Sequence, residues 1–138
     1  MDIAGLKALD IFFFLFHSTL IVFILGGWLW RPLRKANLVV IALTVFCWFF
    51  LGIWFGFGYC PCTDWHWRVR EALGDYNLPF SYIEFLIERP TGQDLPTSAV
   101  NIFTVALFSA SAVASIFVNA RDWRRKRRQT SLRDNQHA

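Results

Sequence analysis

Residues 11–30 read IFFFLFHSTLIVFILGGWLW, an apolar run in which His17 is the only ionisable side chain. Two similar runs follow at residues 36–59 and 95–120, so that the three hold 20, 24 and 26 residues. A helix needs about 20 apolar residues to cross a bilayer, because it rises about 1.5 Å per residue. The chain is therefore predicted to be an all-α membrane protein with three transmembrane helices, at about residues 9–30, 37–59 and 97–120.

The charged residues lie almost entirely between and after these runs. The longest polar connection, residues 60–96, is too short to fold around a core of its own, so we expect it to rest on the membrane. The first run is longer than the apolar core of a signal peptide, and basic residues stand where a cleavage site would follow, which indicates a retained span. Residues 1–123 are predicted to form one membrane domain, followed by a basic tail at residues 124–138.

The basic residues are distributed unevenly among the connections. Arg31, Arg34 and Lys35 follow the first run without an acid, and residues 121–128 hold six basic side chains and one acid. Residues 60–94 hold six acids and three arginines. Because short loops rich in lysine and arginine stay in the cytoplasm, the N-terminus and the loop at residues 60–94 are predicted to face outward, and the C-terminus to face the cytoplasm.

The outer loop is predicted to be structured, with two short interfacial helices between spans two and three. The first follows Thr63 or Asp64 as its N-cap, covers residues 65–73 and stops at Gly74. The second begins at Pro79 and ends at Pro90 and Gly92. Each helix would lay an apolar face on the membrane. These faces consist of Trp65, Val69 and Leu73 in the first helix and of Phe80, Ile83 and Ile87 in the second.

His17 lies near the middle of the first span, where an ionisable side chain is costly and usually faces a partner or a cavity. Glu84, an acid between apolar neighbours in the outer loop, is its candidate partner. A carboxylate can hold an imidazole in one tautomer for ligand binding or proton transfer. The commoner role of such a pair is a structural hydrogen bond inside the bundle, and the sequence leaves both roles open.

Cys60, Cys62 and His66 form a C-x-C-x₃-H pattern that contains three ligands of the kind that copper and zinc bind. The cysteine spacing is shorter than the C-x₂-C of most metal sites, and a fourth ligand would have to come from Asp64 or from a partner. In an oxidising compartment the thiols would instead be oxidised, although a direct bridge across one proline would be strained. Cys47, inside the second span, is interpreted as a small buried hydrophobe.

Small residues recur in two of the spans. They allow helix backbones to approach closely, either among the three spans of this chain or against another subunit. The tail after the third span is strongly basic, which favours an anchor to anionic lipids over nucleic-acid binding, and residues 129–138 are expected to be disordered in isolation. The packing candidates are Gly26, Gly27, Ala106, Ala110 and Ala114, and the tail anchor comprises Arg124, Arg125, Lys126, Arg127 and Arg128.

Three segments together resemble a known family: residues 17–27 (HSTLIVFILGG), residues 58–61 (GYCP) and residues 82–84 (YIE). The chain resembles a family of small bacterial membrane proteins that is catalogued as domain of unknown function 2784. Cys62 departs from the family pattern, in which an apolar residue stands at that position, so the resemblance does not imply a thiol pair throughout the family. It implies the three-span fold and a bacterial inner membrane, with the outer loop in the periplasm, and it implies no activity. The matched positions are His17, Gly26, Gly27, Cys60, Pro61 and Glu84.

No nucleotide or phosphate motif, Ser-His-acid arrangement or carboxylate pair is visible in the loops, and three spans cannot enclose a polar pathway alone. We therefore expect a non-catalytic accessory subunit of a larger membrane complex, such as a respiratory or photosynthetic assembly, with lipids and other membrane subunits as its partners. The first alternative is a metal- or haem-binding redox protein that uses His17, or Cys60, Cys62 and His66. Haem would need a second ligand from elsewhere, since His17 is the only histidine in the spans. A transporter that oligomerises around His17 is the other alternative.

Overall fold

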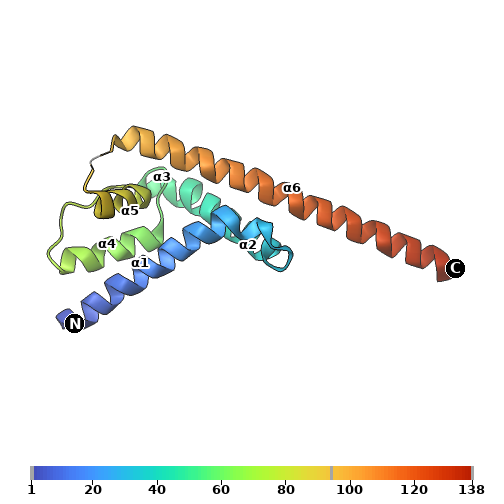
Figure 1. Cartoon of the computed structure of the whole chain (residues 1–138), viewed down its shortest axis with the longest axis horizontal. Helices are drawn as coiled ribbons and strands as arrows, with labels where there is room; N and C mark the ends of the chain where they lie inside the picture. The colour runs from blue at the N-terminus through green and yellow to red at the C-terminus, as the bar shows by residue number, and fades with distance from the viewer. Residues whose placement is uncertain (1, 94, 138) are drawn as a thin grey trace.

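The computed structural model describes residues 2–93 and 95–137, and the side chains of residues 2–93 and 95–133. Six α-helices are arranged in the order that Figure 1 shows. Short 3₁₀ turns at Gly27–Leu29 and Arg31–Leu33 join the first two helices, and a π-helical turn at Cys47–Leu51 joins the second and third. The helices are α1 (Ile3–Gly26), α2 (Arg34–Phe46), α3 (Gly52–Phe55), α4 (Pro61–Ala72), α5 (Tyr82–Thr91) and α6 (Thr97–His137).

Three segments of the described chain are long and apolar enough to cross a membrane, namely Ile3–Leu29, Arg31–Phe55 and Thr97–Arg133. The fold is all-helical within the described residues, and this confirms the prediction of an all-α, multi-pass membrane protein. The C-terminal end of α1 meets the middle of α6, and the two helices separate toward the opposite end of α1 (Figure 1). There α4 packs against α1, and α5 contacts α6.

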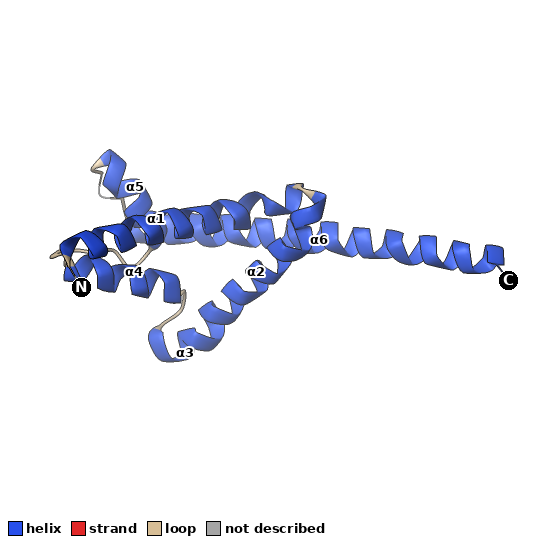
Figure 2. Ribbon diagram, turned by 90° about the horizontal axis from the view of Figure 1, so that it is seen from below, coloured by secondary structure: helices blue, strands red, loops and turns tan. Residues whose placement is uncertain are grey.

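The second span has an irregular course. The π-helical turn interrupts it at Cys47–Leu51, and the helix then ends at Phe55, four residues before the predicted end. The early end follows from Gly56, whose φ of +98° lies in the region that favours glycine. Figure 2 shows that α2 and α3 diverge from α1 and α6 as they leave the turn between α1 and α2. The second span is thus attached firmly at one end only.

The attachment of the second span depends on hydrogen bonds to the last carbonyls of α1. Asn37 is fully buried, and its Nδ2 donates to the carbonyls of Phe23 at 2.7 Å and Ile24 at 3.2 Å. From α6, the Ser111 hydroxyl donates to the same Ile24 carbonyl at 2.6 Å. The Phe23 carbonyl also accepts from the Gly27 N–H, but the last carbonyls of a helix otherwise have no partner in their own helix. Without such donors they would be costly inside a bilayer, so the three spans join at this point.

Arg34 is turned into the protein at the same end of the bundle. It is 8% exposed, and its Nε donates to the Trp28 carbonyl at 2.9 Å. Its Nη1 lies 2.7 Å from the carboxylate of Asp122 on α6, and the Asn119 amide donates to the Arg34 carbonyl at 3.1 Å. This residue, which we counted as one of three basic residues that mark the cytoplasmic loop, also ties α2 to α6.

The third span continues far beyond its predicted end at residue 120. Helix α6 reaches His137, so residues 129–137 of the segment that was expected to be disordered in isolation belong to one long helix. No glycine or proline follows Pro96, and arginine, lysine and glutamine are good helix formers, so nothing in the sequence stops the helix. The basic residues of the tail are exposed on this extension, where Arg127 lies over the Trp123 ring at 3.8 Å.

The two short helices of the outer loop are present, with shifted bounds. Helix α4 begins at Pro61 with Cys60 as its N-cap, and α5 begins at Tyr82 rather than at Pro79. Gly92 ends α5, as predicted, and adopts the left-handed conformation, whereas Pro90, which was also predicted to end the helix, lies inside it. In α4 the side turned to α1 carries Thr63 and His66, whereas Trp65 is 56% exposed. The placement of both helices on the membrane surface remains a prediction.

The small residues divide into two groups. Gly27 is buried, and a Cβ at this position would lie 2.9 Å from Asn37 Nδ2 and 3.0 Å from the Phe23 ring, so the close approach requires glycine. A Cβ at Gly26 would meet nothing within 4 Å. On α6, Ser111 and Ser115 are buried in the bundle, while Ala106 and Ala110 are exposed and Ala114 is half-buried. Helix α6 therefore packs against the rest of the chain through Ser111 and Ser115 rather than through Ala106 and Ala110.

Replacement of Gly27 by alanine is expected to destabilise the fold by about 1–3 kcal/mol, because the added methyl would displace Asn37 from the α1 carbonyls. Gly26→Ala is the matched control and should change stability little, since its methyl enters open space. Unfolding of both variants in mixed micelles measures the difference. Equal stability of the two variants would contradict the close approach at Gly27.

Candidate functional site

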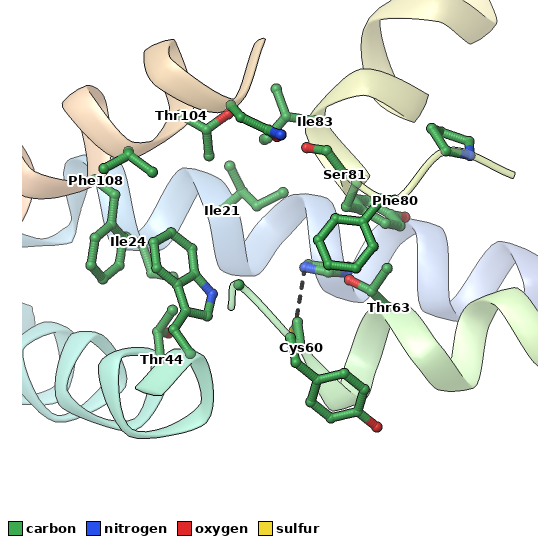
Figure 3. A pocket seen from close by; sticks show the side chains of 18 of the residues that line it. Ile21, Ile24, Thr44, Cys60, Thr63, Phe80, Ser81, Ile83, Thr104 and Phe108 are labelled. Atoms are coloured by element: carbon green, nitrogen blue, oxygen red, sulfur yellow. Dashed lines mark hydrogen bonds between the residues drawn. The ribbon is translucent and has the colours of Figure 1, made fainter. Parts of the chain in front are cut away.

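A cavity of about 660 Å³ lies between α1, the diverging second span, α6 and the segment that carries α4 and α5. Its two ends differ in character. Figure 3 shows Ile24, Thr44 and Phe108 at one end, and Cys60, Thr63 and Ser81 at the other. The apolar end is built by residues of the three candidate spans, and most of the polar end by the outer loop. Cavities of this size and character commonly bind small molecules.

His17 lines the polar end of this cavity. It is 6% exposed, and its ring stacks on Tyr82 with the centroids 3.9 Å apart. Its Nε2 lies 4.0 Å from Cys60 Sγ, the contact drawn as a dashed line in Figure 3. Its Nδ1 is buried and has no partner among the described residues. Buried polar atoms are nearly always hydrogen-bonded. His66 Nδ1 is also without a partner, but His66 binds Asp10 through Nε2 at 2.8 Å, whereas His17 makes no such short hydrogen bond.

Cys60 and Cys62 lie at the beginning of α4, with only Pro61 between them. Interaction with the Cys62 thiol lowers the pKa of the Cys60 thiol, and His17 acts in the same direction against the opposing effect of burial. The same interaction raises the pKa of Cys62. Cys60 is thus the thiol that ionises first. A thiolate is the nucleophilic form of cysteine, so Cys60 is the more reactive residue of the pair.

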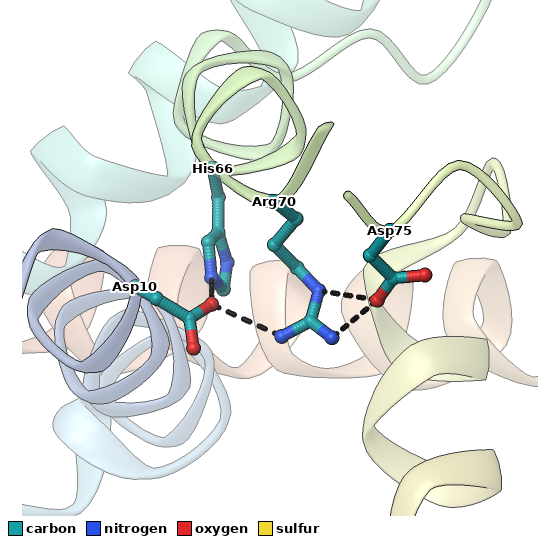
Figure 4. Close-up of polar contacts among 4 residues, drawn as sticks. All are labelled: Asp10, His66, Arg70 and Asp75. Carbon is teal, nitrogen blue, oxygen red and sulfur yellow. Dashed lines mark hydrogen bonds and ion pairs between the residues drawn. The ribbon is translucent and has the colours of Figure 1, made fainter. Parts of the chain in front are cut away.

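A network of four charged or polar side chains holds α4 against α1 (Figure 4). The Asp10 carboxylate accepts from His66 Nε2 at 2.8 Å and from Arg70 Nη1 at 3.0 Å. Arg70 also pairs with Asp75 through Nε at 3.1 Å and through Nη2. His66 is fully buried, and this burial lowers its pKa although Asp10 favours the charged form. The network fixes the start of α4, and with it Cys60, beside His17.

Glu84 has a partner other than the one expected. Its Oε1 accepts a hydrogen bond from the Thr97 hydroxyl at 2.8 Å, which ties α5 to the beginning of α6. The described residues contain no hydrogen bond between Glu84 and His17: the Glu84 carboxylate binds Thr97, and the His17 imidazole contacts Cys60 through Nε2. The predicted His17–Glu84 pair therefore does not form in this structure, although both residues are buried.

The three candidate metal ligands are not brought together either. Cys60 and Cys62 contact one another, but His66 is directed to Asp10, one helical turn further along α4. Within the part of the chain that the structure describes, no group of three histidine, cysteine or acidic side chains has the geometry of a metal site. His17 contacts Cys60 rather than a second histidine ligand.

Sequence reasoning missed Asp10, Arg70 and Tyr82 as parts of this region. Asp10 precedes His17 by seven residues, and residues seven apart lie on the same face of a helix. That spacing was the available signal for a polar stripe on α1. Arg70 was considered only as one of the charges of the outer loop. No sequence pattern around Tyr82 predicted that its ring stacks on His17.

The described residues thus form a three-span, all-helical membrane fold with a polar site where the outer loop closes a cavity between the spans. Residues 7–120 match the protein family described as Protein of Unknown function (DUF2784), and the chain belongs to this family. The match confirms the resemblance seen in the sequence. No curated protein and no solved structure matches the chain.

Replacement of Asp10 by alanine is expected to destabilise the fold by about 3 kcal/mol, because it leaves His66 and one side of Arg70 buried without their acceptor. Arg68→Ala removes a pair to Asp64 in which the arginine side chain is 75% exposed, and this control should change stability by less than about 1 kcal/mol. Thermal unfolding in detergent compares the two. Similar losses would contradict a structural role for the network.

Proposed function

We propose that this chain is an accessory subunit that packs against a larger membrane protein through one face of α6. The observation that carries the proposal is the exposure of small residues on this face. Ala106, Ser109 and Ala110 share one side of the helix and are all exposed, although small residues in a span are usually found where helices meet. Ser109 adds a hydroxyl group at a depth where lipid offers no hydrogen-bond partner.

The internal packing of the chain makes this face available. The buried contacts of α6 with α1 and α2 use Ser111, Ser115 and Val118, which lie on the other side of the helix. The exposed face is therefore not needed to hold the three spans together. A partner helix could approach it closely, because the alanine methyl groups and the serine hydroxyl leave the backbone uncovered. Larger exposed residues, Ile102 and Val113, flank the small patch along the same side.

We place the subunit in a bacterial inner membrane, with the N-terminus and the α4–α5 segment in the periplasm and the end of α6 in the cytoplasm. The charge distribution supports this orientation, since α6 ends in a run of basic residues and the outer loop is acidic. The exposed arginines and Lys126 on the α6 extension would then lie against anionic lipids of the inner leaflet.

The double variant Ala106→Leu/Ala110→Leu is expected to lose its partner, because two leucine side chains would hold the partner helix away from the backbone of α6. Co-purification from the native membrane in mild detergent, followed by mass spectrometry, measures the loss. Ala42→Leu, at another exposed alanine in the second span, is the control and should retain the partner. Equal partner recovery from both variants, or a lone monomer from the unaltered chain, would overturn the proposal.

The orientation can be tested with single cysteines in a chain whose own cysteines are replaced by serine. A membrane-impermeant maleimide should label Tyr76→Cys in intact cells, since Tyr76 is 79% exposed in the outer segment. Gln129→Cys, on the α6 extension, should be labelled only after lysis. The reverse pattern would show the opposite orientation.

A further inference from the structure

The cavity beside Cys60 has features that the accessory role does not use. Its lining combines an apolar end at the level of the spans with a polar end at the outer loop, and it includes no lysine or arginine among the described residues. Asp64 is the only carboxylate in the lining. An anionic head group, such as the phosphate of a lipid, would therefore find no positive partner and one negative charge. The charge of the lining favours an amphiphile with an uncharged head.

The polar end favours a flat, ring-shaped head. Tyr82 stacks on His17 with an angle of 22° between the rings, and Trp67 stacks on Tyr82 with an angle of 24°. His17 has a buried Nδ1 without a partner, so a carbonyl or hydroxyl oxygen would supply the hydrogen bond that this nitrogen lacks. The apolar end, with Ile21, Ile24, Trp48 and Phe108, is suited to an apolar tail.

A thiol pair stands at the same end of the cavity. Cys60 lines the cavity and contacts His17, and Cys62 follows two residues later in the first turn of α4. Both thiols are free. Because only Pro61 separates them, a disulfide between them would be strained. Strained disulfides have a high reduction potential and readily oxidise other thiols. Formation of such a bond requires a correspondingly strong oxidant close by.

We propose that the cavity binds a membrane quinone with its ring beside His17, and that the quinone oxidises the Cys60–Cys62 thiol pair to a disulfide. In this reaction one Sγ–Sγ bond forms while two S–H bonds break. The two thiols lose two electrons and two protons, and the quinone gains both to become a quinol. The quinone is thus the oxidant, and the quinol leaves through the open side of the cavity into the membrane.

The test uses the full-length chain in mild detergent, reduced and kept without oxygen, with decylubiquinone as the probe. Quinol formation is followed by absorbance, and the Cys60–Cys62 bond is identified by peptide mass spectrometry. We expect about one quinol per chain, because one thiol pair supplies two electrons. Cys60→Ser and Cys62→Ser should abolish the reaction, whereas Cys47→Ser, which leaves the pair intact, should retain it. Reduction of the quinone by either serine variant at the original rate would overturn the proposal.

Two comparisons test whether the cavity is the binding site. Thr104→Trp fills the cavity from α6 and should slow quinol formation about tenfold or more. A tenfold effect corresponds to a loss of about 1.4 kcal/mol in the binding free energy of the quinone. Ile116→Trp, on the exposed side of the same helix, should not slow it. In the unaltered chain, a quinone without a tail should react more slowly than decylubiquinone at equal concentration. Equal rates in either comparison would overturn the assignment, and neither result depends on a partner subunit.

Discussion

The last carbonyl groups of α1 set the arrangement of the three spans. In a bilayer no water is available to satisfy them, so other parts of the chain must donate hydrogen bonds there. Asn37 from α2 and Ser111 from α6 do so, and both bonds meet at the carbonyl of Ile24. The three spans are therefore fixed to one another at this end. Away from it the second span is free to diverge, and the π-helical turn and Gly56 then determine where it ends.

The opposite end of the bundle is closed by the outer loop rather than by the spans. Asp10 binds His66 and Arg70 of α4, and Glu84 of α5 binds Thr97 at the beginning of α6. These contacts place two short helices over the space that the diverging spans leave, and they bring Cys60 to His17. The cavity is thus a consequence of packing that is tight at one end and bridged by polar contacts at the other.

The sequence predicted the number of spans and their approximate bounds, because length and apolar composition are sufficient for that. It also predicted the two helices of the outer loop and the glycine that ends α5. It could not predict which polar residues meet. Glu84 and His17 were paired on chemical grounds, but a hydrogen bond depends on the rotation of each helix about its axis, and Thr97 proved to be the partner. The π-helical turn at Cys47–Leu51 likewise leaves no periodic signal.

The polar residues inside the bundle differ in how many hydrogen bonds and ion pairs they make. Asp10, Arg34 and Arg70 each make two or more hydrogen bonds or ion pairs, which is the pattern of groups that hold elements together. His17 is more deeply buried than Asp10 and Arg70, but it has one long contact to a sulfur atom and one nitrogen without a partner. Burial of an imidazole in that state is costly. Other buried atoms, such as His66 Nδ1 and Asn37 Oδ1, also lack a partner, but His66 and Asn37 each make a short hydrogen bond to the scaffold through another atom. His17 makes none and lines the cavity beside Cys60, so it is the place where a ligand would complete the site.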